Sequence, residues 1–100
     1  MAEEIELELG SFHGRTYLLK IRGDPNCEQP DDFAVLIYYK SSSDESGTVV
    51  ARVDNSHGYT HFEKLYRSDE SEERVGWGIW EAVEKLSGEW RRYARIHESE

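Results

Sequence analysis

One polar cluster in the middle of the chain holds most of the side chains that could do chemistry. It comprises two cations, two carboxylates and a histidine: Arg52, Asp54, His61, Glu63 and Arg67. Arginines can hold an anion such as phosphate, while a histidine or a glutamate can move a proton in general acid–base catalysis. We therefore name His61 and Glu63 as candidate catalytic residues. The candidate binding residues are Arg52, Asp54, Asn55, His57 and Arg67.

The same cluster has a simpler interpretation as ion pairs across two strands of a solvated sheet face. Each such pair contributes on the order of a few tenths of a kcal/mol. Paired charges indicate a functional site only probabilistically, because structural ion pairs look the same. We therefore favour ion pairing over catalysis.

Two histidines, His57 and His61, lie near Asp54 and Glu63, which raises the question of a metal site. A four-residue spacing aligns metal ligands on one face of a helix, but here it spans a predicted turn. We therefore expect no metal and no cofactor. A hydrolytic triad of Asp54, Ser56 and His57 is also not expected, because triad members come from separate elements.

A β-hairpin is predicted to position the cluster. Both Thr48–Asn55 and Tyr59–Arg67 are rich in β-branched and aromatic residues. The residues between them include Gly58, which readily adopts the positive φ that a tight turn requires. Loops of different lengths would give different registers. The side-chain pattern can distinguish these registers, because strand side chains alternate between faces.

A two-residue turn at His57-Gly58 separates charged from apolar side chains. It pairs Asp54 with His61 and Arg52 with Glu63 on one face. Valines and aromatic residues then share the other face: Val49, Val53, Phe62 and Tyr66. A three-residue loop mixes the two faces, so we predict the two-residue turn.

Three further strands are predicted before the hairpin, at Ile5–Leu9, Arg15–Arg22 and Phe33–Tyr39. Short polar connections join them, which favours an antiparallel meander. Because Phe33–Tyr39 is apolar on both faces, a second subunit is expected to cover the face that the rest of the chain leaves open, giving a homodimer. The segment Ser68–Arg74 is predicted to be a solvated connection.

One helix is predicted near the end of the sequence. Apolar and aromatic residues recur there every three or four positions: Ile79, Val83, Leu86, Trp90, Tyr93 and His97. This stripe is expected to lie across the apolar face of the hairpin. The prediction is thus an α+β fold over residues 1–100, a single domain with an antiparallel meander sheet of about five strands and one C-terminal helix on one face.

Composition limits the classes of partner. The net charge of −9 disfavours nucleic acid, which is bound mainly through lysine and arginine. No apolar segment is long enough to span a membrane, and the start of the sequence lacks the apolar core of a signal peptide. Cys27 is the only cysteine, which fits a reducing compartment, so a cytoplasmic location is expected. An acidic chain with few lysines is typical of adaptation to high salt, but on charge alone an ordinary acidic mesophilic protein is favoured equally.

The segment Arg52-Val53-Asp54-Asn55-Ser56-His57-Gly58, followed by His61, resembles a signature of the TumE toxin-like family. These are small proteins of bacterial and archaeal toxin–antitoxin pairs. The resemblance implies a toxin that acts on RNA, with an antitoxin-like partner and roles for Arg52, Asp54, Asn55 and His61. The whole chain is also similar to small acidic proteins of halophilic archaea that have no assigned function.

Two functions are therefore expected from the sequence. The first is a noncatalytic module that binds a protein partner or regulates one. The alternative is a TumE-like toxin in which His61 and Glu63 transfer protons, while Arg52 and Arg67 hold phosphate.

Overall fold

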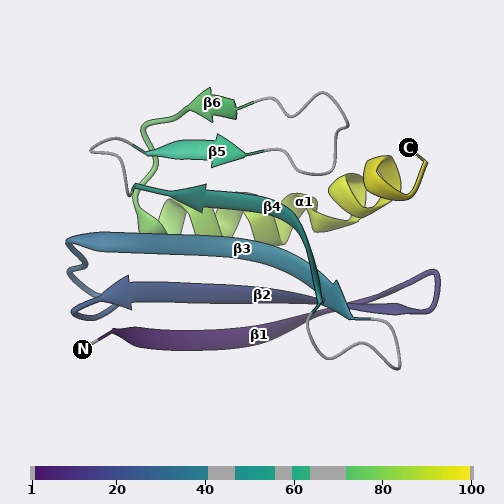
Figure 1. Cartoon of the computed structure of the whole chain (residues 1–100), viewed down its shortest axis with the longest axis horizontal. Coiled ribbons are helices and arrows are strands. Elements are labelled where there is room, and N and C mark those ends of the chain that lie inside the picture. Colours follow the sequence, from purple (N-terminus) through teal and green to yellow (C-terminus); the bar gives the residue numbers. More distant parts are fainter. Residues whose placement is uncertain (1, 41–46, 56–59, 64–71, 100) are drawn as a thin grey trace.

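The computed structural model describes residues 2–40, 47–55, 60–63 and 72–99 (Figure 1). In these ranges the strands are β1 (Glu3–Phe12), β2 (Arg15–Asp24), β3 (Asp32–Lys40), β4 (Thr48–Asp54), β5 (His61–Glu63) and β6 (Glu72–Arg74), followed by helix α1 (Ile79–Ser99). The strands form one antiparallel sheet in chain order. The predicted α+β meander with one C-terminal helix is confirmed. No helix of the described part is both long and apolar enough to cross a membrane.

Strand β6 was not predicted, because Ser68–Arg74 was expected to be a solvated connection. Instead, Glu72–Arg74 pairs with β5 in an antiparallel register. Its sequence, Glu-Glu-Arg, has no alternation and low strand propensity. Such a short strand is formed by pairing with its neighbour, which local sequence does not reveal.

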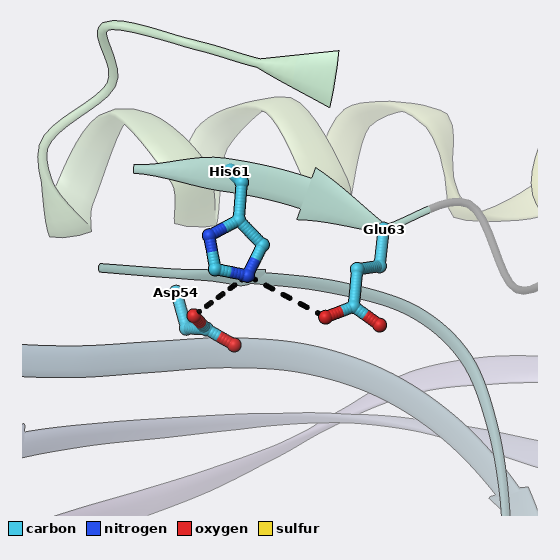
Figure 2. Close-up of side chains that lie close together, drawn as sticks. All are labelled: Asp54, His61 and Glu63. Atoms are coloured by element: carbon cyan, nitrogen blue, oxygen red, sulfur yellow. Dashed lines mark ion pairs between the residues drawn. The ribbon is translucent and has the colours of Figure 1, made fainter. Parts of the chain in front are cut away.

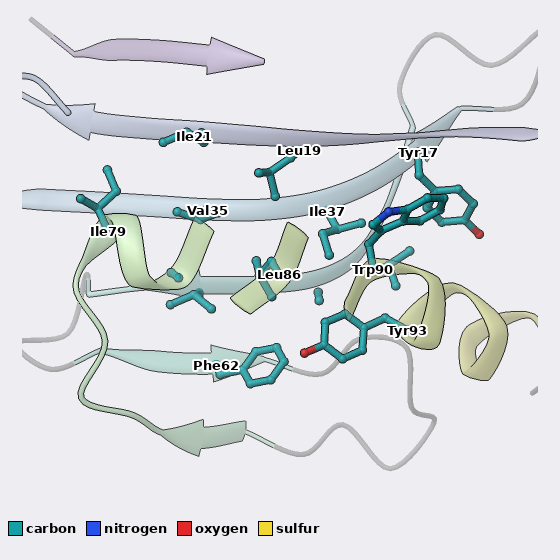
Figure 3. Close-up of a cluster of buried hydrophobic side chains, with 14 of the residues drawn as sticks. Tyr17, Leu19, Ile21, Val35, Ile37, Phe62, Ile79, Leu86, Trp90 and Tyr93 are labelled. Carbon is teal, nitrogen blue, oxygen red and sulfur yellow. The ribbon is translucent and has the colours of Figure 1, made fainter. Parts of the chain in front are cut away.

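Helix α1 covers one face of the sheet, and the core lies between them (Figure 3). Four members of the predicted helical stripe are buried there: Ile79, Leu86, Trp90 and Tyr93. They pack on alternate residues of the central strands, including Leu19, Val35, Ile37 and Val53. We call the opposite side of the sheet, which carries no helix in the described structure, the outer face.

A β-bulge in β4 corrects one detail of the predicted core. Ile37 pairs with Ala51 but Tyr38 pairs with Val49, so Val50 is the extra residue. Consequently Val50, which is fully buried, joins the core cluster in place of Val49. Alternation along Thr48–Asn55 would have placed Val49 there, and a bulge breaks that alternation. The predicted core position Tyr66 lies outside the described residues.

The outer face of β3 is partly covered by polar side chains of the same chain. Tyr38 is 6% exposed, and its hydroxyl donates a hydrogen bond to the Glu6 carboxylate. The ammonium groups of Lys20 and Lys40 lie 5.5 and 5.7 Å from the centre of its ring. Leu36 is half-buried. Much of the apolar character of this face is therefore shielded within the chain, and the homodimer remains a prediction.

Candidate functional site

The β4–β5 register places the polar cluster on the outer face. Asp54 pairs with His61, Val53 with Phe62 and Arg52 with Glu63, as predicted from the sequence. The Phe62 ring lies on the helix side, where its centroid is 5.9 Å from that of Tyr93. Because successive strand residues point to opposite faces, the charged residues are directed away from α1. The predicted turn, including His57, lies outside the described residues, as does Arg67.

His61 lies between two carboxylates (Figure 2). Its Nε2 atom is 3.1 Å from Oδ1 of Asp54 and 3.5 Å from Oε1 of Glu63. The His61 side chain is only 2% exposed and that of Asp54 is 11% exposed, whereas Glu63 at 21% is more accessible. The histidine is thus a buried link between β4 and β5.

Arg52 contacts the same two carboxylates. Its Nε lies 3.3 Å from Oδ2 of Asp54, and its Nη2 lies 2.6 Å from Oε1 of Glu63. Charge-assisted contacts of this kind orient both carboxylates towards the guanidinium. One guanidinium against two carboxylates leaves one net negative charge within this set of three residues.

Asn55 has a structural role at the end of β4. Its side-chain carbonyl accepts a hydrogen bond from the Phe33 backbone N–H at 2.8 Å. Its amide nitrogen donates to the Asp31 carbonyl at 3.2 Å. These contacts fasten the end of β4 to the start of β3. The structure therefore places Asn55 beside the cluster but turned away from it.

Two rows of side chains cross the outer face from β1 to β5. The first row runs through directly paired positions: Glu6, Lys20, Leu36, Arg52 and Glu63. The second row is its neighbour along the strands: Glu4, Arg22, Ala34, Asp54 and His61. In each row, one apolar residue of β3 thus separates the β4 residue from a cation of β2. Leu36 lies between Arg52 and Lys20, and Ala34 lies between Asp54 and Arg22.

A hollow of about 530 Å³ lies over the middle of these rows. Its apolar floor includes Ala34 and Leu36, from β3. Three cations and three carboxylates also line it: Lys20, Arg22, Arg52, Asp24, Asp32 and Asp54. The sequence pattern did not indicate Lys20 or Arg22 as site residues. Alternation along β2 puts them on one face, but only the register of three strands brings them to Arg52.

Comparison with known proteins identifies one family. The model of a domain of unknown function (DUF7718) matches residues 5–100. No curated protein and no solved structure matches the chain.

Proposed function

Because the chain belongs to the DUF7718 family of domains of unknown function, we propose its function from its geometry: it is a noncatalytic module that binds a protein partner through the outer-face hollow. The observation that carries this proposal is the combination of an apolar floor with a rim of both charge signs. Protein interfaces typically surround a buried apolar anchor with polar contacts. We expect a cytoplasmic partner, consistent with the lone Cys27.

The lining residues define the chemistry of that partner. Leu36 and Ala34 offer contact to one apolar side chain, which would enter the hollow as an anchor. Carboxylates of the partner would face Lys20 and Arg22, and its cations would face Asp24 and Asp32. A nucleic acid would instead require a surface dominated by cations, and both the mixed rim and the net charge of −9 disfavour that ligand.

The environment of His61 favours this proposal over a catalytic toxin. A general acid or base must come within hydrogen-bond reach of the proton that it transfers. His61 is 2% exposed, and its Nε2 already faces two carboxylates of its own chain. These contacts favour a structural role for His61 beside the binding surface over a catalytic role in contact with RNA.

The test begins with capture from an extract of the host, followed by reconstitution with the purified partner. We would compare the wild type with Leu36→Asp in the floor of the hollow and with Trp80→Ala on α1, where Trp80 is 49% exposed. Titration calorimetry should show one partner per chain. Leu36→Asp should weaken binding by about tenfold or more, and Trp80→Ala should leave it unchanged.

Three outcomes would overturn the proposal. Equal affinity of Leu36→Asp and the wild type would remove the hollow from the interface. A stable dimer in light scattering that Leu36→Asp dissociates would show that a second copy of the chain occupies this face. Growth arrest with RNA cleavage, both abolished by His61→Ala but not by Leu36→Asp, would support the RNA-directed toxin instead.

A further inference from the structure

We propose that Asp54, His61 and Glu63 form a binding site for a divalent transition metal ion, with Zn²⁺ as the ion that their donor atoms suit best. One nitrogen and two carboxylate oxygens from these residues all lie within 4.8 Å of one another. Neighbouring strands present them: Asp54 of β4 pairs directly with His61 of β5, and Glu63 lies two residues further along β5. The site goes beyond the proposed protein-binding function and does not depend on it.

The spacing of the donor atoms fits one small ion. The Nε2 atom of His61 lies 3.1 Å from the Asp54 oxygen and 3.5 Å from the Glu63 oxygen. Zinc bonds to nitrogen and oxygen measure about 2.0–2.2 Å, so two ligands of a tetrahedral zinc lie about 3.3–3.6 Å apart. A modest rotation of Glu63, the most exposed of the three, would bring its oxygen to the same distance from Asp54.

The donor types select a class of metal. Calcium and magnesium prefer sites made of oxygen alone, whereas an imidazole nitrogen favours zinc and its neighbours in the first transition row. Three protein ligands also leave a fourth position for water or another ligand. This combination is the reason for choosing Zn²⁺ as the probe.

The hydrogen-bond geometry supports a cation at this point. One N–H at Nε2 of His61 can point well at only one of the two carboxylate oxygens at a time. An ion bound to Nε2 in place of that proton would contact both carboxylates. Arg52 reaches Asp54 through Oδ2, which leaves Oδ1 directed at His61. That contact resembles the outer-shell hydrogen bonds that orient metal-binding carboxylates. With the ion bound to Oε1 of Glu63, the Arg52 guanidinium would contact the other oxygen of that carboxylate.

The sequence pointed away from this site. The four-residue spacing of His57 and His61 has no meaning across a turn, and so we expected no metal. The proposed ligands instead come from the strand pairing, which joins Asp54 to His61 and places Glu63 two residues further along β5. The pairing was predicted, but the approach of Glu63 to the imidazole was not.

The experiment is a calorimetric titration of the full chain with Zn²⁺, repeated with Co²⁺ and read by its visible absorption. We would compare the wild type with Glu63→Gln and with His13→Gln. His13 is a matched control, because it also pairs with a glutamate, Glu98, at 2.8 Å but has a side chain that is 69% exposed. The wild type and His13→Gln should bind one ion and show the Co²⁺ spectrum of a nitrogen–oxygen site. Glu63→Gln should weaken binding by about tenfold or more.

Thermal unfolding provides a second readout, because an ion that binds only the folded chain raises its unfolding temperature. At the same Zn²⁺ concentration, the rise should be larger for the wild type than for Glu63→Gln. If Glu63→Gln does not fold, Asp54→Asn takes its place. The absence of zinc binding by the wild type, or equal binding by the ligand variant, would overturn the proposal. Loss of zinc binding in His13→Gln, with binding retained in Glu63→Gln, would also overturn it.

Discussion

The Tyr17 hydroxyl donates a 2.8 Å hydrogen bond to the carboxylate of Glu98, which joins β2 to the last turn of α1. The other carboxylate oxygen is 2.8 Å from Nδ1 of His13, at the tip of the β1–β2 hairpin. Arg15 adds an ion pair at 3.6 Å. Burial raises the pKa of Glu98, but these hydrogen bonds and charges outweigh it and lower the pKa overall. One side chain thus fastens the end of the helix to the first hairpin.

Replacing Glu98 by Gln should therefore destabilise the protein in a pH-dependent manner. Hydrogen bonds to a charged group contribute about 2 kcal/mol, so the loss at pH 7 should be of this order. Because folding lowers the pKa of Glu98, its contribution is complete above the ordinary glutamate pKa of about 4.3 and is lost as the pH falls through the folded value. Urea unfolding at pH 7 and pH 3 should show a difference between wild type and variant at pH 7 that shrinks at pH 3.

The exposed Glu84 on the same helix provides the control for that measurement. Glu84→Gln should change the free energy of unfolding by less than about 0.5 kcal/mol at both pH values. If Glu98→Gln lowered the free energy of unfolding equally at pH 7 and pH 3, this would contradict a stabilising role for the charge of Glu98.

Phe62→Ala should be among the most destabilising substitutions in the hairpin. Phe62 is 5% exposed and packs against Trp77 and Tyr93, with ring centroids 5.5 and 5.9 Å away. Removal of a buried phenylalanine side chain costs about 3–5 kcal/mol. Trp80→Ala removes a larger aromatic group that is 49% exposed and should cost much less. Denaturant unfolding measures the free energy of unfolding of both variants. A similar decrease for the two would contradict the placement of Phe62 on the buried, helix-facing side of the sheet.

Gly88→Ala should stabilise the protein. A Cβ added at Gly88 meets nothing within 4 Å, and alanine is favoured over glycine inside a helix by about 1 kcal/mol. Gly23→Ala is the contrasting variant, because its Cβ would lie 2.5 Å from the backbone oxygen of Asn26. Thermal unfolding should show a higher midpoint for Gly88→Ala and a lower one for Gly23→Ala. A lower midpoint for Gly88→Ala would indicate that this glycine has a role beyond the helix backbone.

The thermal midpoint should rise with KCl concentration. A net charge of −9 causes self-repulsion in the folded state, and salt screens it. Unfolding curves at increasing KCl measure the effect directly. A midpoint that stays constant or falls would contradict adaptation to a salty environment.

The parts of the fold that were predictable depend on local periodicity. Alternation in the hairpin determined that Val53 and Phe62 face the core while Arg52 and Glu63 face outward, because only one register separates apolar from charged side chains. The spacing of Leu86, Trp90 and Tyr93 likewise predicted the buried side of the helix. In both cases the prediction needs only the types and spacing of residues that are close together in the sequence.

The remaining features depend on contacts between distant segments. Tyr17 and Glu98 are 81 residues apart, and neither has a neighbour in sequence that indicates the other. The hollow requires Lys20, Leu36 and Arg52 to be aligned across three strands, which only the combined registers specify. The bulge at Val50 follows from how β4 fits β3 and not from its own composition.

That bulge separates the pairing of β3 with β4 into two regions. It lies between the pairs Ile37–Ala51 and Tyr38–Val49, whereas Leu36–Arg52 and Ala34–Asp54 lie beyond it towards the end of β4. A shift of the pairing by one residue on the Val49 side of the bulge would move Thr48 and Val49 to the opposite face, because strand side chains alternate between faces. The outward positions of Arg52 and Asp54 therefore do not depend on the register of the residues that precede Val50.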